Sequence, residues 1–158
     1  KVDASEISND PNQDELADFV RTVAKAADKR KAEDIKAIRV SKLTATTAFI
    51  VIVSGNSRPQ NQAIAAAISE DVEQLYNGMK TKSGKMEGSA DSGWILLDYG
   101  DVMVHVMTPK SRLFYDIEGI WKKGEVLDLS GILVPNNSFN DGGLESSSLP
   151  EEEDPFWT

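Results

Sequence analysis

The stretch GWILLDYGDVMVHVM, residues 93–107, consists of two apolar runs separated by a glycine-containing turn sequence. Such a pattern is typical of a β-hairpin. With Gly100 and Asp101 as a two-residue turn, Tyr99 faces Val102, and alternate residues then point to opposite faces of the sheet. The hairpin therefore sets the register of the expected sheet, and a shift by one residue would exchange its two faces.

The two faces of this hairpin differ in chemistry. One is almost purely apolar, as expected for a face covered by helices: Ile95, Leu97, Tyr99, Val102, Val104 and Val106. The other mixes large apolar side chains with one acid and the only histidine of the chain: Trp94, Leu96, Asp98, Met103, His105 and Met107. Tryptophan and methionine are enriched at the centres of protein interfaces, so this second face is a candidate partner surface. On the hairpin alone, a core position for Trp94 and a purely structural role for His105 are alternatives.

Outward from the hairpin, apolar residues recur at helical and strand spacings. The pattern predicts helices over 14–32 and 59–76, strands over 35–40 and 49–53, and a weak strand near 80–85. The strand at 49–53 is an almost continuous apolar run, which indicates burial on both faces. Together with the hairpin, these elements predict an α/β domain with a mixed β-sheet flanked by helices.

A final helix is expected after the hairpin. Thr108 and Pro109 have the residue types of an N-cap and a first helical position. This helix is expected to bury Leu113, Ile117, Ile120 and Trp121. Beyond it, the segment EVLDLSGILVP, residues 125–135, is expected to dock as an arm.

The composition predicts one domain and excludes several classes of site. The chain has 158 residues, 40% of them hydrophobic, and is expected to comprise a disordered lead at 1–12, a domain at 13–135 and an acidic disordered tail at 136–158. It has no cysteine and one histidine, which excludes disulfides, thiol chemistry and a histidine-rich zinc site, and no cofactor or metal is expected. Its apolar stretches are shorter than a membrane span, so no membrane partner is expected.

The charge lies mainly at the ends of the chain. Of the net charge of −9, residues 141–158 carry −6 and residues 1–12 carry −2, which leaves −1 for the middle. A near-neutral middle argues against strong direct binding of nucleic acid and favours a protein partner. The terminal EEEDPFWT, residues 151–158, is either a short docking motif or a solubilising appendage.

No catalytic pattern is evident, and we expect the chain not to be an enzyme. SGNSRP, residues 54–59, is no phosphate-binding P-loop, because no Gly-Lys-Ser/Thr closes it. The alternative is a nucleotide-binding or nucleotidyl-transferring enzyme. Its candidate residues are Gly55, Ser57, Asp98 and Asp101.

The hairpin sequence WILLDYGDVMVHVM, followed by RLFYDIEGIW, resembles the ribosomal silencing factor family, also known as Iojap. The resemblance covers roughly residues 14–123. The residues at the family's signature spacing are Trp94, Asp98, Gly100, Asp101, His105, Arg112, Tyr115, Glu118 and Trp121.

The resemblance implies a fold similar to nucleotidyltransferases without their catalytic acids. It also implies binding of the large ribosomal subunit through its fourteenth ribosomal protein, which keeps the small subunit from joining and represses translation; mitochondrial relatives assist large-subunit assembly. Carried over to this chain, Trp94, Asp98, His105, Arg112 and Tyr115 form or shape the partner surface. With the remaining residues of the mixed hairpin face, the expected partner-binding set is Trp94, Leu96, Asp98, Met103, His105, Met107, Arg112 and Tyr115.

Short sequence features also give expectations for the cellular compartment and the oligomeric state. SRPQ, residues 57–60, is similar to plastid members of the family, and the chain starts at Lys1 rather than Met, so a chloroplast or other organelle location is expected, with the bacterial cytoplasm as the alternative. A sheet edge or the mixed hairpin face is also a possible homodimer contact.

Overall fold

The computed structural model describes residues 9–133 of the chain. In chain order its elements are η2 (Pro11–Gln13), α1 (Ala17–Lys29), β1 (Glu33–Arg39), β2 (Phe49–Ser54), α2 (Arg58–Leu75), β3 (Glu87–Ser89), η3 (Ala90–Ser92), β4 (Trp94–Asp98), β5 (Val102–Met107), α3 (Pro109–Tyr115), α4 (Ile117–Ile120) and β6 (Glu125–Val126). The predicted acidic tail at 136–158, with its terminal docking motif, lies outside the described residues, as do residues 1–8 of the predicted lead.

The strands form one mixed sheet in the order β3-β4-β5-β2-β1-β6. Only β2 and β5 run parallel, because the chain crosses over between them through α2, while the other neighbours are antiparallel. All six residues of β2 are buried, as their continuous apolar run predicts for a central strand. The α/β class and the mixed sheet are thereby confirmed.

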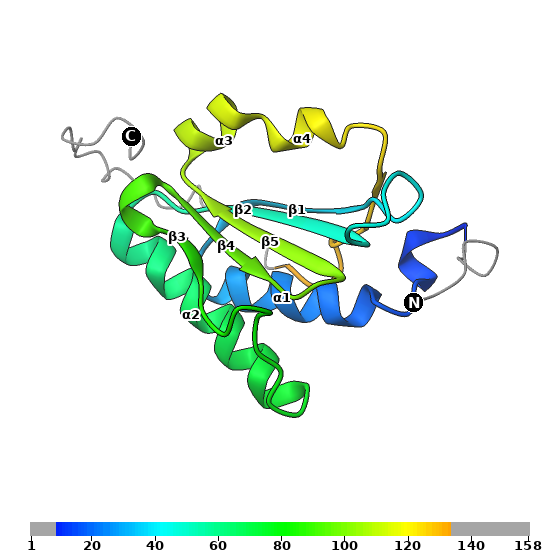
Figure 1. Cartoon of the computed structure of the whole chain (residues 1–158), viewed down its shortest axis with the longest axis horizontal. Helices are drawn as coiled ribbons and strands as arrows, with labels where there is room; N and C mark the ends of the chain where they lie inside the picture. Colours follow the sequence, from blue (N-terminus) through cyan, green and yellow to red (C-terminus); the bar gives the residue numbers. More distant parts are fainter. Residues whose placement is uncertain (1–8, 134–158) are drawn as a thin grey trace.

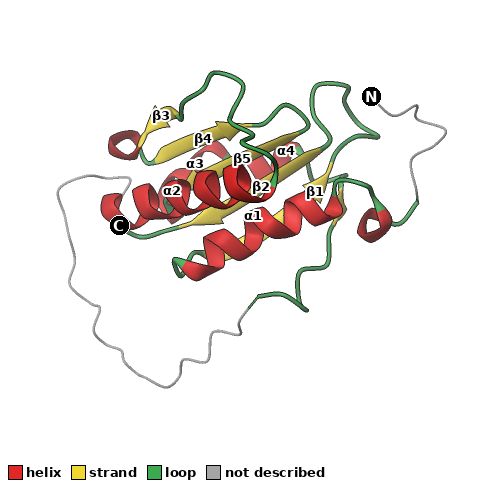
Figure 2. Ribbon diagram, turned by 90° about the horizontal axis from the view of Figure 1, so that it is seen from below, coloured by secondary structure: helices red, strands yellow, loops and turns green. Residues whose placement is uncertain are grey.

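Helices α1 and α2 lie side by side and cover one face of the sheet (Figures 1 and 2). Both helices place apolar residues at intervals of three and four, so each buries one stripe against the sheet. The buried residues of α1 include Phe19, Val20, Val23, Ala26 and Ala27, and those of α2 include Ile64, Ala65, Ala67, Ile68 and Val72. These residues form the larger core cluster with the inward side chains of β2, β4 and β5.

Helices α3 and α4 cover only part of the opposite face (Figure 1). Thr108 caps α3 as predicted, because its side chain accepts the Ser111 N–H at 3.1 Å. The prediction of one continuous final helix is wrong. Asp116, with φ of 49°, ends α3 and caps α4 by accepting the Gly119 N–H at 3.1 Å. The break leaves Leu113 82% exposed and Ile120 64% exposed, whereas Ile117 is buried as predicted.

The segment between α2 and β4 differs from the prediction. Residues 80–85 form a loop, and the strand β3 follows it at the edge of the sheet. Glycine and lysine dominate the loop, and these residues pack poorly on a pleated surface. The expected strand at 80–85 is therefore wrong by several residues.

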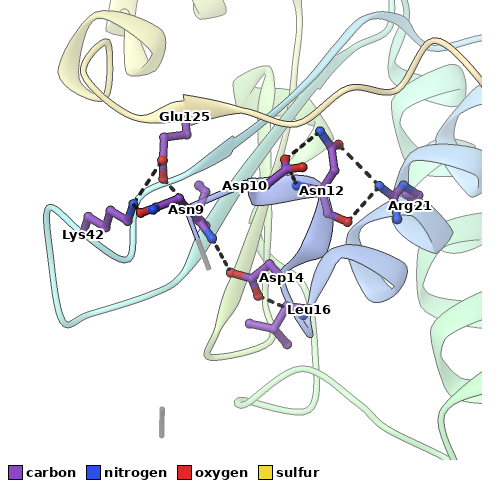
Figure 3. Close-up of polar contacts among 9 residues, drawn as sticks. Asn9, Asp10, Asn12, Asp14, Leu16, Arg21, Lys42 and Glu125 are labelled. Atoms are coloured by element: carbon purple, nitrogen blue, oxygen red, sulfur yellow. Dashed lines mark hydrogen bonds and ion pairs between the residues drawn. The ribbon is translucent and has the colours of Figure 1, made fainter. Parts of the chain in front are cut away.

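The two ends of the described chain meet beside Arg39, whose side chain is fully buried at the C-terminal end of β1. Arg39 donates to Glu125 at 2.8 Å and to Asp14 at 3.0 Å. Figure 3 shows the polar residues that gather here, including Asn12, which accepts the Asp128 N–H at 3.1 Å. The structured chain thus begins before residue 13. The arm expected after Gly124 does dock, since Leu127 and Leu129 are buried against the larger core cluster.

Candidate docking surface

The register of the β4–β5 hairpin is the one predicted from its turn. Trp94 pairs with Met107, Asp98 pairs with Met103, and the Tyr99 N–H donates to the Val102 carbonyl at 2.9 Å. The turn needs glycine because Gly100 has φ of +86°. The Gly100 N–H also donates to Oδ1 of Asp98 at 2.8 Å, which gives this acid a local turn-forming role.

The two hairpin faces separate as this register requires. On the side of α1 and α2, the aliphatic residues Ile95, Leu97, Val102, Val104 and Val106 are buried, with Tyr99 packed against the same core. On the other side, Trp94, Leu96, Asp98 and Met103 are half-buried, whereas His105 is 7% exposed and Met107 is completely buried. Four of the six predicted hairpin residues therefore reach the surface, and two support it from beneath.

Two neighbouring side chains, His105 and Tyr115, contact the ring of Trp94. Its Nε1–H donates to Nδ1 of His105 at 2.9 Å, and its ring lies 4.6 Å, between ring centroids, from that of Tyr115 in α3. The acceptor role of Nδ1 requires the histidine tautomer that carries its proton on Nε2. Burial lowers the pKa of His105 to about 4, so the ring is neutral at pH 7. His105 therefore fixes the orientation of the Trp94 ring.

Met107 belongs to the smaller core cluster between the sheet and α4. It packs there with Ile38, Val40, Ile50, Ile52 and Ile117, and Trp94 and Met103 lie against the cluster. With no exposed area, Met107 contributes to the surface only by supporting the residues above it.

Hydrogen bonds of Arg112 connect α3 and α4 to the C-terminal end of β2. Its Nη1 donates to Oγ of Ser54 at 2.9 Å, and its Nε and Nη2 donate to the two carboxylate oxygens of Glu118 at 3.2 and 3.1 Å. Lys36 adds a contact of 3.2 Å to the same carboxylate. These hydrogen bonds hold the pKa of Glu118 below its usual value. Arg112 is buried, so it positions the helix that carries Tyr115.

Helix α3 presents an apolar ridge next to the exposed half of the sheet. Phe114 is 69% exposed and Tyr115 is 42% exposed, and their rings meet edge to face at 4.9 Å. Large exposed apolar side chains that adjoin one another mark interaction sites more often than chance placement. We use the term docking surface for Trp94, Leu96, Asp98, Met103, Phe114 and Tyr115.

Sequence reasoning missed Phe114 as a surface residue and assigned Leu113 to the core. A continuous helix would have turned Leu113, Ile117 and Ile120 to one buried side. The missed signal is Asp116 three residues before Gly119, the spacing of an aspartate N-cap that starts a new helix.

The alternative prediction was a nucleotide-binding or nucleotidyl-transferring enzyme, and its four candidate residues do not lie close together in the structure. Ser54 pairs with Met107 at one end of the parallel β2–β5 pair, and Phe49 pairs with Val102 at the other. Gly55 and Ser57 follow the first end, whereas Asp98 and Asp101 flank the turn at the second, about 16 Å away along the strand. Ser57 is moreover engaged as the N-cap of α2.

Two other features are absent from residues 9–133. This part of the chain holds no group of three or more histidine or acidic side chains arranged to bind a metal ion. None of its helices combines the length and the apolar character that crossing a membrane demands.

Comparisons with known proteins match the amino-acid sequence to one family. The family model described as "Ribosomal silencing factor during starvation" matches residues 13–149. Ribosomal silencing factor RsfS of Bacillus subtilis is 36% identical over 111 residues, which are 70% of this chain and 91% of the relative. The chloroplastic protein Iojap of Arabidopsis thaliana is 34% identical over 120 residues, 76% of this chain and 48% of that longer protein.

A solved structure agrees with the fold. The crystal structure of a Chromobacterium violaceum protein superposes with a TM-score of 0.63 at 31% identity, over 68% of this chain and 87% of the other. The family model covers well over half of the chain, and it includes the hairpin, Arg112, Tyr115 and Glu118. The chain therefore belongs to the ribosomal silencing factor family.

Proposed function

We propose that this protein binds the large ribosomal subunit and represses translation by keeping the small subunit from joining. The observation that carries the proposal is the family match over residues 13–149, together with relatives that are named ribosomal silencing factors. The partner on the subunit is its fourteenth ribosomal protein, as the sequence resemblance implies. The mechanism is steric exclusion, so repression scales with occupancy and needs neither catalysis nor a cofactor.

The docking surface has the physical properties that such an interface needs. Trp94 is oriented in advance by His105 and Tyr115, so little side-chain entropy is lost when a partner covers it. A preorganised aromatic residue beside further apolar side chains is the usual composition of an interface hot spot. Asp98 places one charge on this surface and supplies orientation toward a basic partner.

The test is co-sedimentation of the full chain with isolated large subunits, isolated small subunits and joined ribosomes. The wild-type protein is expected to pellet with large subunits only and to lower the yield of joined particles when small subunits are added. Phe114→Ala is expected to weaken binding on the order of tenfold. Equal binding to both subunits, or none, would contradict the proposal.

A matched control separates lost contacts from lost folding. Leu75, at the end of α2, is 64% exposed and lies on the opposite side of the sheet from α3. Both Leu75→Ala and Phe114→Ala remove an exposed apolar side chain, so both variants are expected to fold. Leu75→Ala is expected to bind like the wild type, and a loss equal to that of Phe114→Ala would show that the docking surface is placed wrongly.

The same surface is also the candidate contact of a homodimer, because it is largely apolar and reaches the surface of the single chain. A dimer of this kind competes with the ribosome. Sedimentation velocity over a range of concentrations measures the association, and Phe114→Ala is expected to shift it toward the monomer.

For the compartment, we propose a chloroplast or other organelle, supported by residues 57–60 and by the chloroplastic relative. The bacterial cytoplasm is the alternative, supported by the bacterial relatives. Fractionation of source cells, with detection of the chain in organelles or in the cytoplasm, distinguishes the two.

A further inference from the structure

A pocket of about 370 Å³ opens beside α3, on its flank toward β1. It lies on the α3–α4 side of the sheet, since Lys36 pairs with Ile52 of the smaller core cluster and Ser54 is bonded to Arg112. Its lining residues are Asp34, Ile35, Lys36, Ser54, Pro109, Arg112, Leu113, Asp116 and Glu118. This volume is at the lower end of the roughly 300–1,000 Å³ of ligand pockets, and it accommodates one long side chain.

Both cations on the floor of the pocket already have an acidic partner. Arg112 uses Nε, Nη1 and Nη2 to bind Glu118 and Ser54, and Lys36 also pairs with Glu118. An incoming anion would have to displace Glu118 from these two cations. The floor is therefore closed to phosphate or carboxylate.

The rim of the pocket carries uncompensated negative charge. Asp34 makes no hydrogen bond or ion pair with its side chain among the described residues, and Asp116 makes no ion pair there. With Glu118, the lining has three acids against the two bases Lys36 and Arg112. A β-bulge between Glu33 and Lys36 displaces Asp34 from the regular pleat, so this acid does not follow the alternation of β1.

The pocket wall is apolar. Pro109 and Leu113 provide it, and Leu113 is largely exposed. The side chain of Ile35, by contrast, packs against the larger core cluster on the other face of the sheet. A methylene stem that lies along this wall at the pocket mouth brings a cationic head beside Asp34 and Asp116, and lysine and arginine have this chemistry.

We propose that this pocket receives one lysine or arginine side chain of the protein that covers the docking surface. The inference rests on the proposed function, because α3 belongs to both sites. Phe114 and Tyr115 of the docking surface directly follow Leu113 of the pocket wall. Since α3 has seven residues and is about 10 Å long, a partner lying on its aromatic residues also reaches the pocket mouth.

The first test removes the negative charge of Asp34 at the pocket rim and keeps the backbone conformation of this residue. Asp34 has φ of 50°, a conformation that asparagine tolerates as well as aspartate, so Asp34→Asn is expected to fold normally. Its affinity for isolated large subunits is expected to fall on the order of tenfold. Glu70→Gln, which removes an exposed acid from α2 on the other side of the sheet, is the control and is expected to bind like the wild type.

The outcomes separate the two proposals. If the wild type binds large subunits and Asp34→Asn binds them equally tightly, the pocket proposal is overturned and the proposed function stands. An equal loss in Glu70→Gln also overturns it, because the effect would then be one of net charge. Failure of the wild type to bind large subunits overturns the proposed function and, with it, this occupant of the pocket.

A second test needs no ribosome. N-acetyl-arginine methylamide is titrated into the full chain while amide NMR shifts are followed, with N-acetyl-glutamate methylamide as the comparison. Saturable shifts at Ile35, Ser54 and Leu113 with the cationic probe, lost in Asp34→Asn, are the expected result. Shifts with the anionic probe alone, or with neither probe, would overturn the proposal.

Discussion

The indole N–H of Trp94 donates a 2.9 Å hydrogen bond to the imidazole of His105 across the β4–β5 pair. The half-buried tryptophan of the docking surface is thus hydrogen-bonded to a buried, neutral histidine. Because the bond uses the lone pair on Nδ1, protonation of that nitrogen breaks it.

The first prediction concerns acid stability. The pKa of His105 is about 4 in the folded chain against 6.5 in the unfolded chain, so between these values only the unfolded chain binds the proton. Stability is therefore lost as the pH falls from 6.5 to 4, by about 2 kcal/mol at pH 5. Urea unfolding at pH 7.5 and pH 5, compared between the wild type and His105→Gln, measures it. If the wild type loses no more stability between these pH values than His105→Gln does, the pH dependence does not come from His105.

The second prediction concerns Glu118. Its pKa is lowered by the hydrogen bonds from Arg112, so its contribution to stability is present above pH 4.5 and is lost as the pH falls below that value. Glu118→Gln keeps the shape but leaves the buried Arg112 without its anion. We expect a loss of about 2 kcal/mol at pH 7. Hydrogen exchange in α3 and α4 should increase more than in α1. An equal increase in all three helices would argue against a local role of Glu118.

The third prediction concerns Arg39, the link between the two ends of the described chain. Burial disfavours the charge of Arg39, but hydrogen bonds to Glu125 and Asp14 outweigh it and raise its pKa. Arg39→Ala leaves both acids without their shared cation, and we expect a loss of about 3 kcal/mol. Limited proteolysis should then cut near residues 9–16 and 124–133 before it cuts β1 to β5. Arg30→Ala, which removes an exposed arginine at the C-terminal end of α1, is the control and should leave this pattern unchanged.

The fourth prediction concerns the hairpin turn. A methyl group on Gly100 would meet only the flexible Lys82 side chain, at 3.7 Å, so the cost of Gly100→Ala comes from the positive φ alone. We expect about 1–2 kcal/mol for alanine. Asparagine tolerates positive φ better, so Gly100→Asn should cost less. Thermal or urea unfolding of both variants measures the difference, and equal costs would point to packing instead of backbone strain.

Several parts of the fold were predictable because local patterns specify them. The alternation of the hairpin, with glycine at a position of positive φ, fixed its register and its two faces. The Thr108–Pro109 start of α3 was predictable for the same reason. The candidate docking surface was only partly predictable. Alternation shows which face His105 and Met107 share but not how deeply each is buried.

The amino-acid sequence alone was sufficient for the α/β class, the hairpin register and the family, because these depend on residues that are close together in the chain. The burial of Arg39 and Arg112 became visible only in three dimensions, as did the exposed ridge of α3 and the pocket beside it. Arg39 meets acids 25 and 86 residues away, and Arg112 meets a serine 58 residues away. No local pattern encodes such pairs, because a buried charge is stable only where distant segments bring its counter-charge and hydrogen-bond partners within reach.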